Sequence, residues 1–457
     1  MVMTDFSREI AAWADGQRRR LQQADAVTAY GRVTGISGIL LECSLPRARI
    51  GDLCRITRSA QESVLAEVVG FNPQHTLLSA LGPLDGIARG ARVTPLWLPH
   101  SISVSDALLG SVLDGFGRPL DEQSVGAFAL PGMGVDTVPV VSDAPPPTAR
   151  PRIARPLPTG VRAIDGLLTL GVGQRVGVFA GAGCGKTTLL AELARNTPCD
   201  AIVFGLIGER GRELREFLDH ELDEALRSRT VLVCATSDRS SMERARAAFT
   251  ATAIAEAFRA QGKSVLLILD SLTRFARAQR EIGLALGEPP GRGGLPPSVY
   301  TLLPGLLERA GQTMTGSITA LYSVLIEADS MNDPVADEVR SLIDGHIVLT
   351  RRLAERGHYP AIDVLASLSR TMSNVAERAQ IVDATRLRRL MSAWQQVEML
   401  IRLGEYEPGH DAMTDAAVEA QGAINGFLRQ ETRDPCAWEE TLQQLTEVSG
   451  YAPEQEQ

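Results

Sequence analysis

The sequence predicts an α/β protein in which a small β-barrel precedes a mainly parallel sheet and a helical domain follows it. Three changes along the 457 residues indicate this order. Short runs broken by glycine and proline extend from about Val27 to Pro95, apolar strand patterns alternate with helical patterns beyond Thr159, and strand patterns stop after about Ser373. The chain is also too long for one ordinary hydrophobic core, so we expect several domains.

The composition excludes several classes of protein. A hydrophobic share of 44% and a charged share of 22% are typical of globular proteins and argue against a disordered chain. No stretch approaches the roughly 20 uninterrupted apolar residues of a membrane span, and the N-terminus lacks a secretory signal, so we expect a cytoplasmic protein. The formal net charge of −9 argues against a protein that coats nucleic acid, and six cysteines without a C-x-x-C pair favour reduced thiols over a zinc site.

Residues 1–22 have the pattern of an amphipathic helix. Phe6, Ile10, Trp13 and Leu21 fall on one stripe, and three arginines close the last turn, where cations suit the helix dipole. The helix could dock on its own domain, or it could bind a membrane surface or a partner protein. Both interpretations stay open, because an exposed Trp and Phe at a terminus need something to cover them.

Three domains are predicted after this helix. Residues 23–95 form the β-barrel, because turn residues recur at short, regular intervals. Residues 96–373 form the α/β domain, and six prolines in its lead-in at 143–160 predict an extended connection. Residues 374–457 form the C-terminal helical domain. Apolar runs that alternate with helices such as Ser241 to Ala260 supply the parallel sheet: RVGVFA, AIVFGLI, VLVCATS, SVLLILD, SITALYSVLI and HIVLT.

The segment AGAGCGKTT follows a predicted strand and precedes a predicted helix, which is the context that a phosphate-binding loop requires. Its glycines let the backbone curl so that consecutive N–H groups point inward. Lys186 would contact the β- and γ-phosphates, and the hydroxyl of Thr187 would bind Mg²⁺. The strict motif has glycine where this chain has Ala180, but Ala180 ends the strand and its methyl group should be tolerated. The residues expected to bind the phosphates are Gly181, Ala182, Gly183, Cys184, Gly185, Lys186, Thr187 and Thr188.

Two further strands end in acidic residues that should lie beside this loop, because open parallel sheets bind ligands at the carboxyl ends of their strands. Asp270 closes the run SVLLILD and is expected to reach Mg²⁺. Glu209 and Arg210 follow the run AIVFGLI. Glu209 can orient or deprotonate the attacking water, and Arg210 can brace it or contact phosphate. A solvated charge cluster is the competing interpretation of these two residues.

Several motifs occur in one order: AGAGCGKTTLL, IGERGRE, LLILDSLTRFARAQREI, GSITALYSVL and LASLSR. With them the chain resembles the ATPases of bacterial type III secretion systems, in particular the Hrp-type injectisome ATPases of plant-associated bacteria. These are related to the flagellar export ATPase and to the catalytic β subunit of rotary ATP synthases. The resemblance extends from about Val27 to at least Tyr406. It implies a RecA-like P-loop NTPase core, ATP and Mg²⁺ as cofactors, and a homohexameric ring with nucleotide sites between subunits.

The resemblance also assigns roles to single residues. Lys186 and Thr187 match the P-loop pair, Asp270 the magnesium aspartate, Glu209 the catalytic glutamate and Arg210 the arginine beside it. Arg370 in LASLSR matches an arginine finger that reaches the γ-phosphate held by the neighbouring subunit. Tyr359 in HYPAID matches the aromatic residue that packs on the adenine ring.

The resemblance further implies partners and a place in the cell. The ring would lie at the cytoplasmic base of the membrane export apparatus, peripherally associated with the inner membrane. There it would release effectors from their chaperones and energise their unfolding and export. A stator-like regulatory protein would bind the N-terminal helix, and a central stalk protein would enter the ring. Arg292, in the loop 287–294, is a candidate contact to that stalk or to substrate.

Three other functions are compatible with parts of the sequence. The flagellar export ATPase is a close alternative. A catalytically silent ring subunit is another, and the presence of Glu209 argues against it. A hexameric nucleic-acid translocase can share this core and a small barrel, but it should present aromatic residues that stack on bases. The barrel region has few of them (Tyr30, Phe71 and Trp97), so no nucleic acid is expected as a partner.

Overall fold

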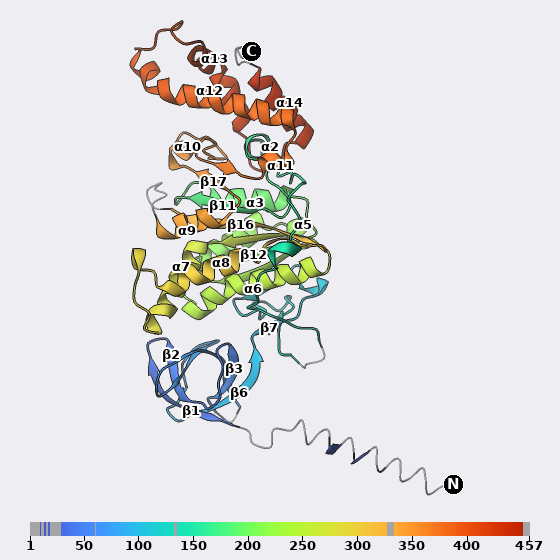
Figure 1. The fold of residues 1–457 in the computed structure, drawn as a ribbon, viewed down its shortest axis with the longest axis vertical. Coiled ribbons are helices and arrows are strands. Elements are labelled where there is room, and N and C mark those ends of the chain that lie inside the picture. The colour runs from blue at the N-terminus through green and yellow to red at the C-terminus, as the bar shows by residue number, and fades with distance from the viewer. Residues whose placement is uncertain are drawn as a thin grey trace, which may run out of the picture. The chain divides into compact units, whose positions relative to one another are not determined.

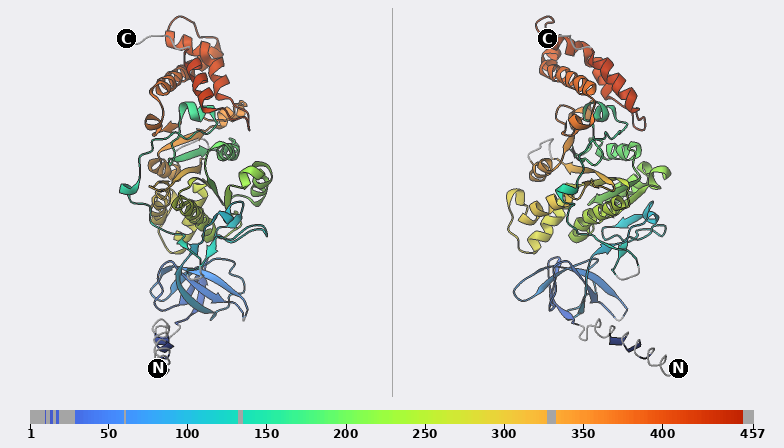
Figure 2. Two further views of the ribbon diagram at one scale, coloured as in Figure 1. Left: turned by 90° about the vertical axis from the view of Figure 1, so that its right-hand side faces the viewer. Right: turned by 45° about the vertical axis from the view of Figure 1, so that its right-hand side comes forward.

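The computed structural model describes residues 29–59, 61–131, 135–326 and 333–450, together with five positions near the N-terminus, Ile10, Trp13, Ala14, Gln17 and Arg18. It contains two compact units, Met1–Pro99 and His100–Gln457 (Figures 1 and 2). The five N-terminal positions have helical backbone, and the rest of the helix predicted over residues 1–22 lies outside the described residues. None of the helices within the described ranges is long and apolar enough to cross a membrane.

The first unit is a closed six-stranded barrel, as the spacing of its turn residues predicts (Figure 1). Neighbouring strands are antiparallel, and alternate residues such as Leu41, Ile56, Leu78 and Val93 fill the interior. The last strand runs to Pro99, whereas the sequence placed the end of the barrel at residue 95. In chain order the strands are β1 (Gly31–Ser37), β2 (Leu40–Ser44), β3 (Asp52–Thr57), β4 (Ser63–Phe71), β5 (Thr76–Ala80) and β6 (Arg92–Pro99).

The second unit is built on a nine-stranded sheet with the order β18-β17-β11-β16-β14-β12-β13-β8, and β15 pairs with β16 at its side. All neighbours are parallel except the pairs made by β15 and β18, so the predicted mainly parallel sheet is confirmed. The strands are β8 (Val112–Asp114), β11 (Arg175–Ala180), β12 (Ala201–Ile207), β13 (Thr230–Ala235), β14 (Ser264–Asp270), β15 (Gly311–Gln312), β16 (Ser317–Leu325), β17 (Gly345–Leu349) and β18 (Leu368–Ser369). A separate small sheet contains β7 (Ser101–Ile102), β9 (Phe128–Ala129) and β10 (Val138–Pro139).

Helices cover both faces of this sheet, which is why its central strands are buried along their whole length. The predicted helix Ser241–Ala260 is α6, and Ser240 caps it by accepting a hydrogen bond from the N–H of Glu243. The other helices of the α/β part are α2 (Arg162–Leu167), α3 (Lys186–Asn196), α4 (Gly211–Glu216), α5 (Glu224–Arg227), α7 (Leu272–Ala285), α8 (Pro297–Leu307), α9 (Pro334–Leu342), α10 (Arg351–Glu355) and α11 (Met372–Val375).

Three helices follow the sheet and pack on one another, so the predicted C-terminal helical part is confirmed (Figure 1). They are α12 (Arg378–Leu403), α13 (Ala412–Leu428) and α14 (Trp438–Ser449). The first ends at Gly404, whose φ of 76° lies in the left-handed region that favours glycine at a helix C-terminus. Apolar residues of α12, among them Leu387 and Leu390, join the same core as α3 and one face of the sheet.

The buried side chain of Arg309 links the segment that precedes the sheet to helix α6. Arg309 is only 1% exposed, and its Nη1 donates a hydrogen bond to the carbonyl oxygen of Val140 at 2.9 Å. Its Nη2 contacts the carboxylate of Glu256, which also lies 3.7 Å from Arg259. A charge buried to this extent is stabilising only while its partners remain in place.

We predict that Arg309→Met lowers the free energy of unfolding by about 3 kcal/mol, because it leaves Glu256 short of one cation and the Val140 carbonyl without its donor. Denaturant unfolding followed by circular dichroism measures the change. Arg152→Met is the matched control: Arg152 is exposed, and the change should shift stability by less than about 0.5 kcal/mol. Equal midpoints for the two variants would contradict the role given to Arg309.

Candidate functional site

The predicted phosphate-binding loop joins the end of β11 to the start of α3. Gly183 and Gly185 both have a φ of 79°, which a residue with a side chain rarely adopts. No atom lies within 4 Å of the position that a Cβ would take at Gly183, so the loop leaves open space on that side. Ala180 pairs with Leu325 and Leu349 as the last residue of its strand. Its methyl group therefore stays outside the curled backbone, as expected from the sequence.

Lys186 and Asp270 form a salt bridge beside this loop. Their side chains are only 10% and 4% exposed. Ser323, in β16, binds both: its Oγ donates a hydrogen bond to Asp270 Oδ1 at 2.6 Å and accepts one from Lys186 Nζ at 3.3 Å. Ser323 is a site residue that the sequence did not reveal, because a single serine in a buried strand forms no recognisable pattern. The salt bridge joins the two residues predicted for phosphate and for magnesium.

Glu209 follows β12 and lies close to this pair. Its carboxylate accepts a hydrogen bond from Arg274 Nη2 at 3.0 Å, and Arg274 Nη1 also binds the Gly208 carbonyl. Burial raises the pKa of Glu209 to about 7, helped by a hydrogen bond with Glu213 and by the charge of Asp270, while Lys186 and Arg274 act in the opposite direction. The same contact lowers the pKa of Glu213.

The chain offered a weak signal for Arg274 that the sequence analysis did not use. Arg274 lies four positions after Asp270, in the first turn of α7, and so near the end of the same strand. An arginine placed there can reach groups at the edge of the sheet where Glu209 also lies.

Two cavities open on the loop. One, of about 430 Å³, is lined by Thr187, Glu209 and Asp270 together with Glu213 and Phe217. The other, of about 350 Å³, has the loop glycines, Thr188, Leu189, Leu349 and Tyr359 in its walls. The first therefore gathers the polar residues predicted for catalysis and metal binding, and the second offers apolar walls beside the phosphate loop.

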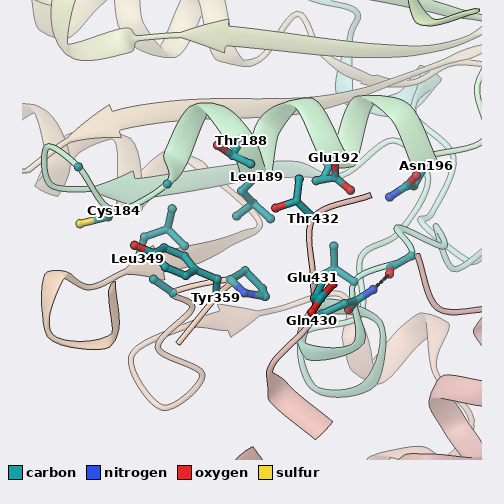
Figure 3. A pocket seen from close by; sticks show the side chains of 16 residues that line it. Cys184, Thr188, Leu189, Glu192, Asn196, Leu349, Tyr359, Gln430, Glu431 and Thr432 are labelled. Carbon is teal, nitrogen blue, oxygen red and sulfur yellow. Dashed lines mark hydrogen bonds between the residues drawn. The ribbon is translucent and has the colours of Figure 1, made fainter. Parts of the chain in front are cut away.

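Tyr359 reaches the second cavity from the segment after α10. Its ring carbon Cε1 lies 3.6 Å from the position that a Cβ would take at Gly185, and 47% of the residue is exposed. Figure 3 shows Tyr359 and Leu349 on one side of the cavity and α3 on the other. An exposed aromatic face beside a phosphate loop has room for a flat ring to stack on it.

The segment after α13 closes this cavity, and the sequence analysis missed it. Gln430, Glu431 and Thr432 line the cavity (Figure 3). The N–H of Gln430 donates to the Tyr359 carbonyl at 2.9 Å, and its Nε2 donates to the Gly160 carbonyl at 2.7 Å. These residues lie far from the loop in sequence, and no local pattern marks them, so only the fold could reveal the contact.

The donor set fits a magnesium ion that is shared with a nucleotide. Thr187 and Asp270 line one cavity and offer a hydroxyl and a carboxylate, the hard oxygen ligands that Mg²⁺ prefers. No cluster of three or more His, Cys, Asp or Glu side chains suited to a metal occurs in the described ranges. A site with so few protein ligands suits Mg²⁺, which keeps several waters and takes its other ligands from phosphates.

The sequence predicts that Arg210 braces the attacking water or contacts phosphate and that Arg292 contacts a central stalk or substrate; neither residue lines the two cavities. Arg210 is 74% exposed at its side chain, lies 3.6 Å from Glu213, and does not line either cavity described above. Arg292, the candidate for a stalk contact, is exposed as well and lies 3.5 Å from Asp337.

Arg370 lies at the amino-terminal ends of the parallel strands, whereas the phosphate loop lies at their carboxyl ends. It follows β18, which pairs with the beginning of β17, and its N–H donates to the carbonyl oxygen of Asp344 at 3.0 Å. Asp344 in turn binds the side chain of Arg175, the first residue of β11, whereas the loop follows the last residue of that strand. At about 3.3 Å per residue, β11 separates the two places by roughly 16 Å. Arg370 therefore does not belong to the nucleotide site of its own chain.

Three protein-family models match the chain in succession. The ATP synthase alpha/beta family contributes its beta-barrel domain over residues 33–96 and its nucleotide-binding domain over residues 160–369. The T3SS EscN ATPase C-terminal domain matches residues 376–447. The fold class predicted from the sequence, with barrel, nucleotide-binding core and C-terminal helices, is confirmed.

Individual proteins extend these matches to nearly the whole chain. A type 3 secretion system ATPase of Pseudomonas syringae pv. tomato is 67% identical over 97% of this chain and 98% of its own length. A flagellum-specific ATP synthase of Bacillus subtilis is 43% identical over 94% and 97%. The solved structure of the assembled ATPase EscN from enteropathogenic E. coli has a TM-score of 0.86 at 46% identity and covers 92% of this chain and 100% of its own.

A second EscN structure, in complex with its central stalk EscO, has a TM-score of 0.84 at 46% identity, again over 92% of this chain and 100% of its own. Of the secretion and flagellar relatives, the secretion ATPase shares the higher identity with this chain. The predicted resemblance and the predicted enzyme class are both confirmed: the chain belongs to the type III secretion system ATPases.

Proposed function

We propose that this ATPase hydrolyses magnesium-bound ATP at sites shared between the subunits of a homohexameric ring. The observation that supports this most directly is the position of Glu209, a carboxylate with a pKa near 7, in the same cavity as Thr187 and Asp270. A group with such a pKa can exchange a proton with water at physiological pH.

Each residue beside the loop has a proposed part in the reaction. Lys186 would bind the β- and γ-phosphates, and Thr187 and Asp270 would hold the magnesium ion, which would offset the negative charge of the phosphates. Glu209 orients the attacking water and accepts its proton, while Arg274 holds the Glu209 carboxylate in position. The loop from Gly181 to Gly185 supplies backbone N–H groups to the phosphates, and the N-terminal end of α3 adds its positive dipole.

Tyr359 is proposed to bind the adenine ring. Its exposed face and the apolar wall at Leu349 lie in the cavity that continues from the loop (Figure 3). The segment at Gln430 closes the far side and so connects the adenine end of the site to the C-terminal helices. Bound nucleotide would then tie the helical part to the sheet.

The position of Arg370 supports a ring. An arginine roughly one strand length away from its own loop can act on a nucleotide only across a subunit boundary. The assembled state of EscN, which shares the fold over 92% of this chain, supports such an arrangement. Arg210, exposed beside Glu213, is proposed to join the site when the neighbouring subunit and the nucleotide are in place.

The proposed setting is the cytoplasmic base of a type III export apparatus, in peripheral contact with the inner membrane. There the ring would release effectors from chaperones and energise their unfolding and export. EscN forms a complex with a central stalk, which supports a stalk partner here and gives Arg292 a possible contact. A stator-like protein at the N-terminal helix completes the proposed partners.

We predict that Lys186→Ala and Glu209→Gln each lower kcat for ATP hydrolysis by about 100-fold or more, because each removes a group that stabilises or activates the reacting atoms. Phosphate release at saturating ATP measures the loss. The control for Lys186→Ala is Lys263→Ala, which changes the only other lysine of the chain and leaves the site intact. The control for Glu209→Gln is Glu216→Gln, because Glu216 lines the same cavity as Glu209. Near-wild-type turnover in either site variant would refute the assignment.

The raised pKa of Glu209 predicts a pH dependence. Below pH 7 its carboxyl group is mostly protonated and cannot accept a proton, so hydrolysis should rise with pH through about 7. Glu213→Gln removes the neighbouring carboxylate that raises this pKa, and the midpoint of the pH–rate profile should move to lower pH. Glu216→Gln should leave the midpoint in place. A midpoint that stays fixed or rises in Glu213→Gln would disprove the coupling.

Shared sites predict complementation between two inactive variants. Arg370→Ala keeps an intact phosphate loop, and Lys186→Ala keeps an intact arginine finger. When the two proteins are mixed and allowed to assemble, some interfaces combine both intact halves and hydrolysis should partly return. Activity of the mixture equal to the average of the separate proteins would show that Arg370 does not act across subunits.

A further inference from the structure

A fully buried glutamine lies beneath the segment that carries Arg370. Gln174 is 0% exposed and ends the turn that leads into β11. Its Oε1 accepts hydrogen bonds from the Gly171 N–H at 2.8 Å and from Thr371 Oγ1 at 2.6 Å. Its Nε2 donates to the Asp344 carbonyl oxygen at 3.2 Å and to Ser369 Oγ at 3.3 Å. Four hydrogen bonds are all that a side-chain amide can make.

The orientation of this amide is fixed by its backbone partners. A backbone N–H can only donate, so the atom facing Gly171 must be the oxygen. A carbonyl oxygen can only accept, so the atom facing Asp344 must be the nitrogen. Gln174 therefore cannot flip without leaving two buried groups unpaired, and its neighbours at positions 369 and 371 are bound in one arrangement.

The hydrogen bonds of Gln174 hold the residues on both sides of Arg370 in the chain. Ser369 and Thr371, its two neighbours, each bind the Gln174 amide. The Asp344 carbonyl that accepts from Gln174 also accepts the N–H of Arg370 itself at 3.0 Å. Ser369 is further held by the Thr169 carbonyl at 2.8 Å. The N–H of Arg370 and the side chains of both its neighbours are thus held by hydrogen bonds.

The side chain of Arg370 differs from this backbone. The residue is exposed, and its guanidinium forms no hydrogen bond or ion pair with any residue in the described ranges. The guanidinium of such an arginine is free to bind an incoming anion, and the fixed backbone limits the positions that the guanidinium can reach. That combination suits a group that must meet a phosphate on another subunit, because small errors in placement cost large factors in rate.

We propose that Gln174 is a positioning residue for the arginine finger: its amide fixes Ser369 and Thr371 and thereby directs Arg370 toward the neighbouring subunit's nucleotide. The inference rests on the proposed function of Arg370. Gln174 acts on the site of the neighbour and not on the phosphate loop of its own chain, which lies at the other end of β11. In this proposal the turn before β11 stabilises the fold and, through Gln174, also positions Arg370 for catalysis.

The test uses Gln174→Met, which keeps the length of the side chain and removes all four hydrogen bonds. We expect kcat for ATP hydrolysis in the assembled protein to fall between about 10-fold and about 100-fold, with KM for ATP changed less than about twofold. Thr371→Val is the milder variant, since it removes the hydroxyl that binds Gln174 Oε1; it should show a smaller loss in the same direction. Thr319→Val is the matched control, because it removes the hydrogen bond that Thr319 Oγ1 accepts from Gly173 in the same turn without touching positions 369–371.

Two further measurements separate positioning from a general loss of structure. In an Arg370→Ala background, Gln174→Met should cause no additional loss of kcat, because the group it positions is absent. Mixed with Lys186→Ala, Gln174→Met should recover activity, because the recovered interfaces join its intact loop to a well-placed finger. An additive loss in the double variant, or no recovery in the mixture, would overturn the proposal. If Arg370→Ala alone had wild-type activity, the assignment of Arg370 as an arginine finger would be refuted, and the role of Gln174 would be refuted with it.

Discussion

The salt bridge between Lys186 and Asp270 is the interaction on which the nucleotide site depends. An ammonium and a carboxylate that are buried to this degree each carry a large desolvation cost, which their contact and the hydrogen bonds of Ser323 offset. The pair exists because β11, β14 and β16 are adjacent and parallel, so their carboxyl ends meet. In the proposed function, phosphate would face Lys186 and a magnesium ion would face Asp270. Bound ligand would then give each of these two charges an opposite charge in place of the salt bridge.

The two carboxylates beside the loop have different surroundings and therefore different uses. Asp270 contacts the ammonium of Lys186 and accepts a hydrogen bond from the hydroxyl of Ser323. Glu209 is buried next to a second carboxylate, Glu213, and the pKa of Glu209 rises to about 7. Arg274 holds Glu209 in place but does not cancel this effect. The carboxylate proposed to bind metal and the carboxylate proposed to accept a proton thus differ in their environment.

The two ends of β11 carry the phosphate loop and the turn beside Arg370, which are the two halves of the proposed shared site. The phosphate loop follows its last residue, and the turn with Gln174 precedes its first. Arg370 lies with that turn, held by Asp344 and by the neighbours that Gln174 binds. A single strand therefore sets the distance between the phosphate loop and Arg370, the proposed arginine finger. Such a strand suits a ring in which every subunit contributes to two sites.

The sequence by itself determined the elements and the local chemistry. Strands such as β12 and β14 and the helix α6 begin and end where their apolar runs and caps predict, and the loop at Gly181–Thr188 was recognisable because its pattern is contiguous. Family resemblance supplied the roles of Arg370 and Tyr359, which no local pattern reveals. Only the tertiary structure decided the long-range contacts: Ser323 on the salt bridge, Gln430 at the adenine end and Gln174 beneath the finger segment. Each joins groups that are far apart in the chain, and a buried amide or hydroxyl carries no sequence signal of the partner that folding will bring to it.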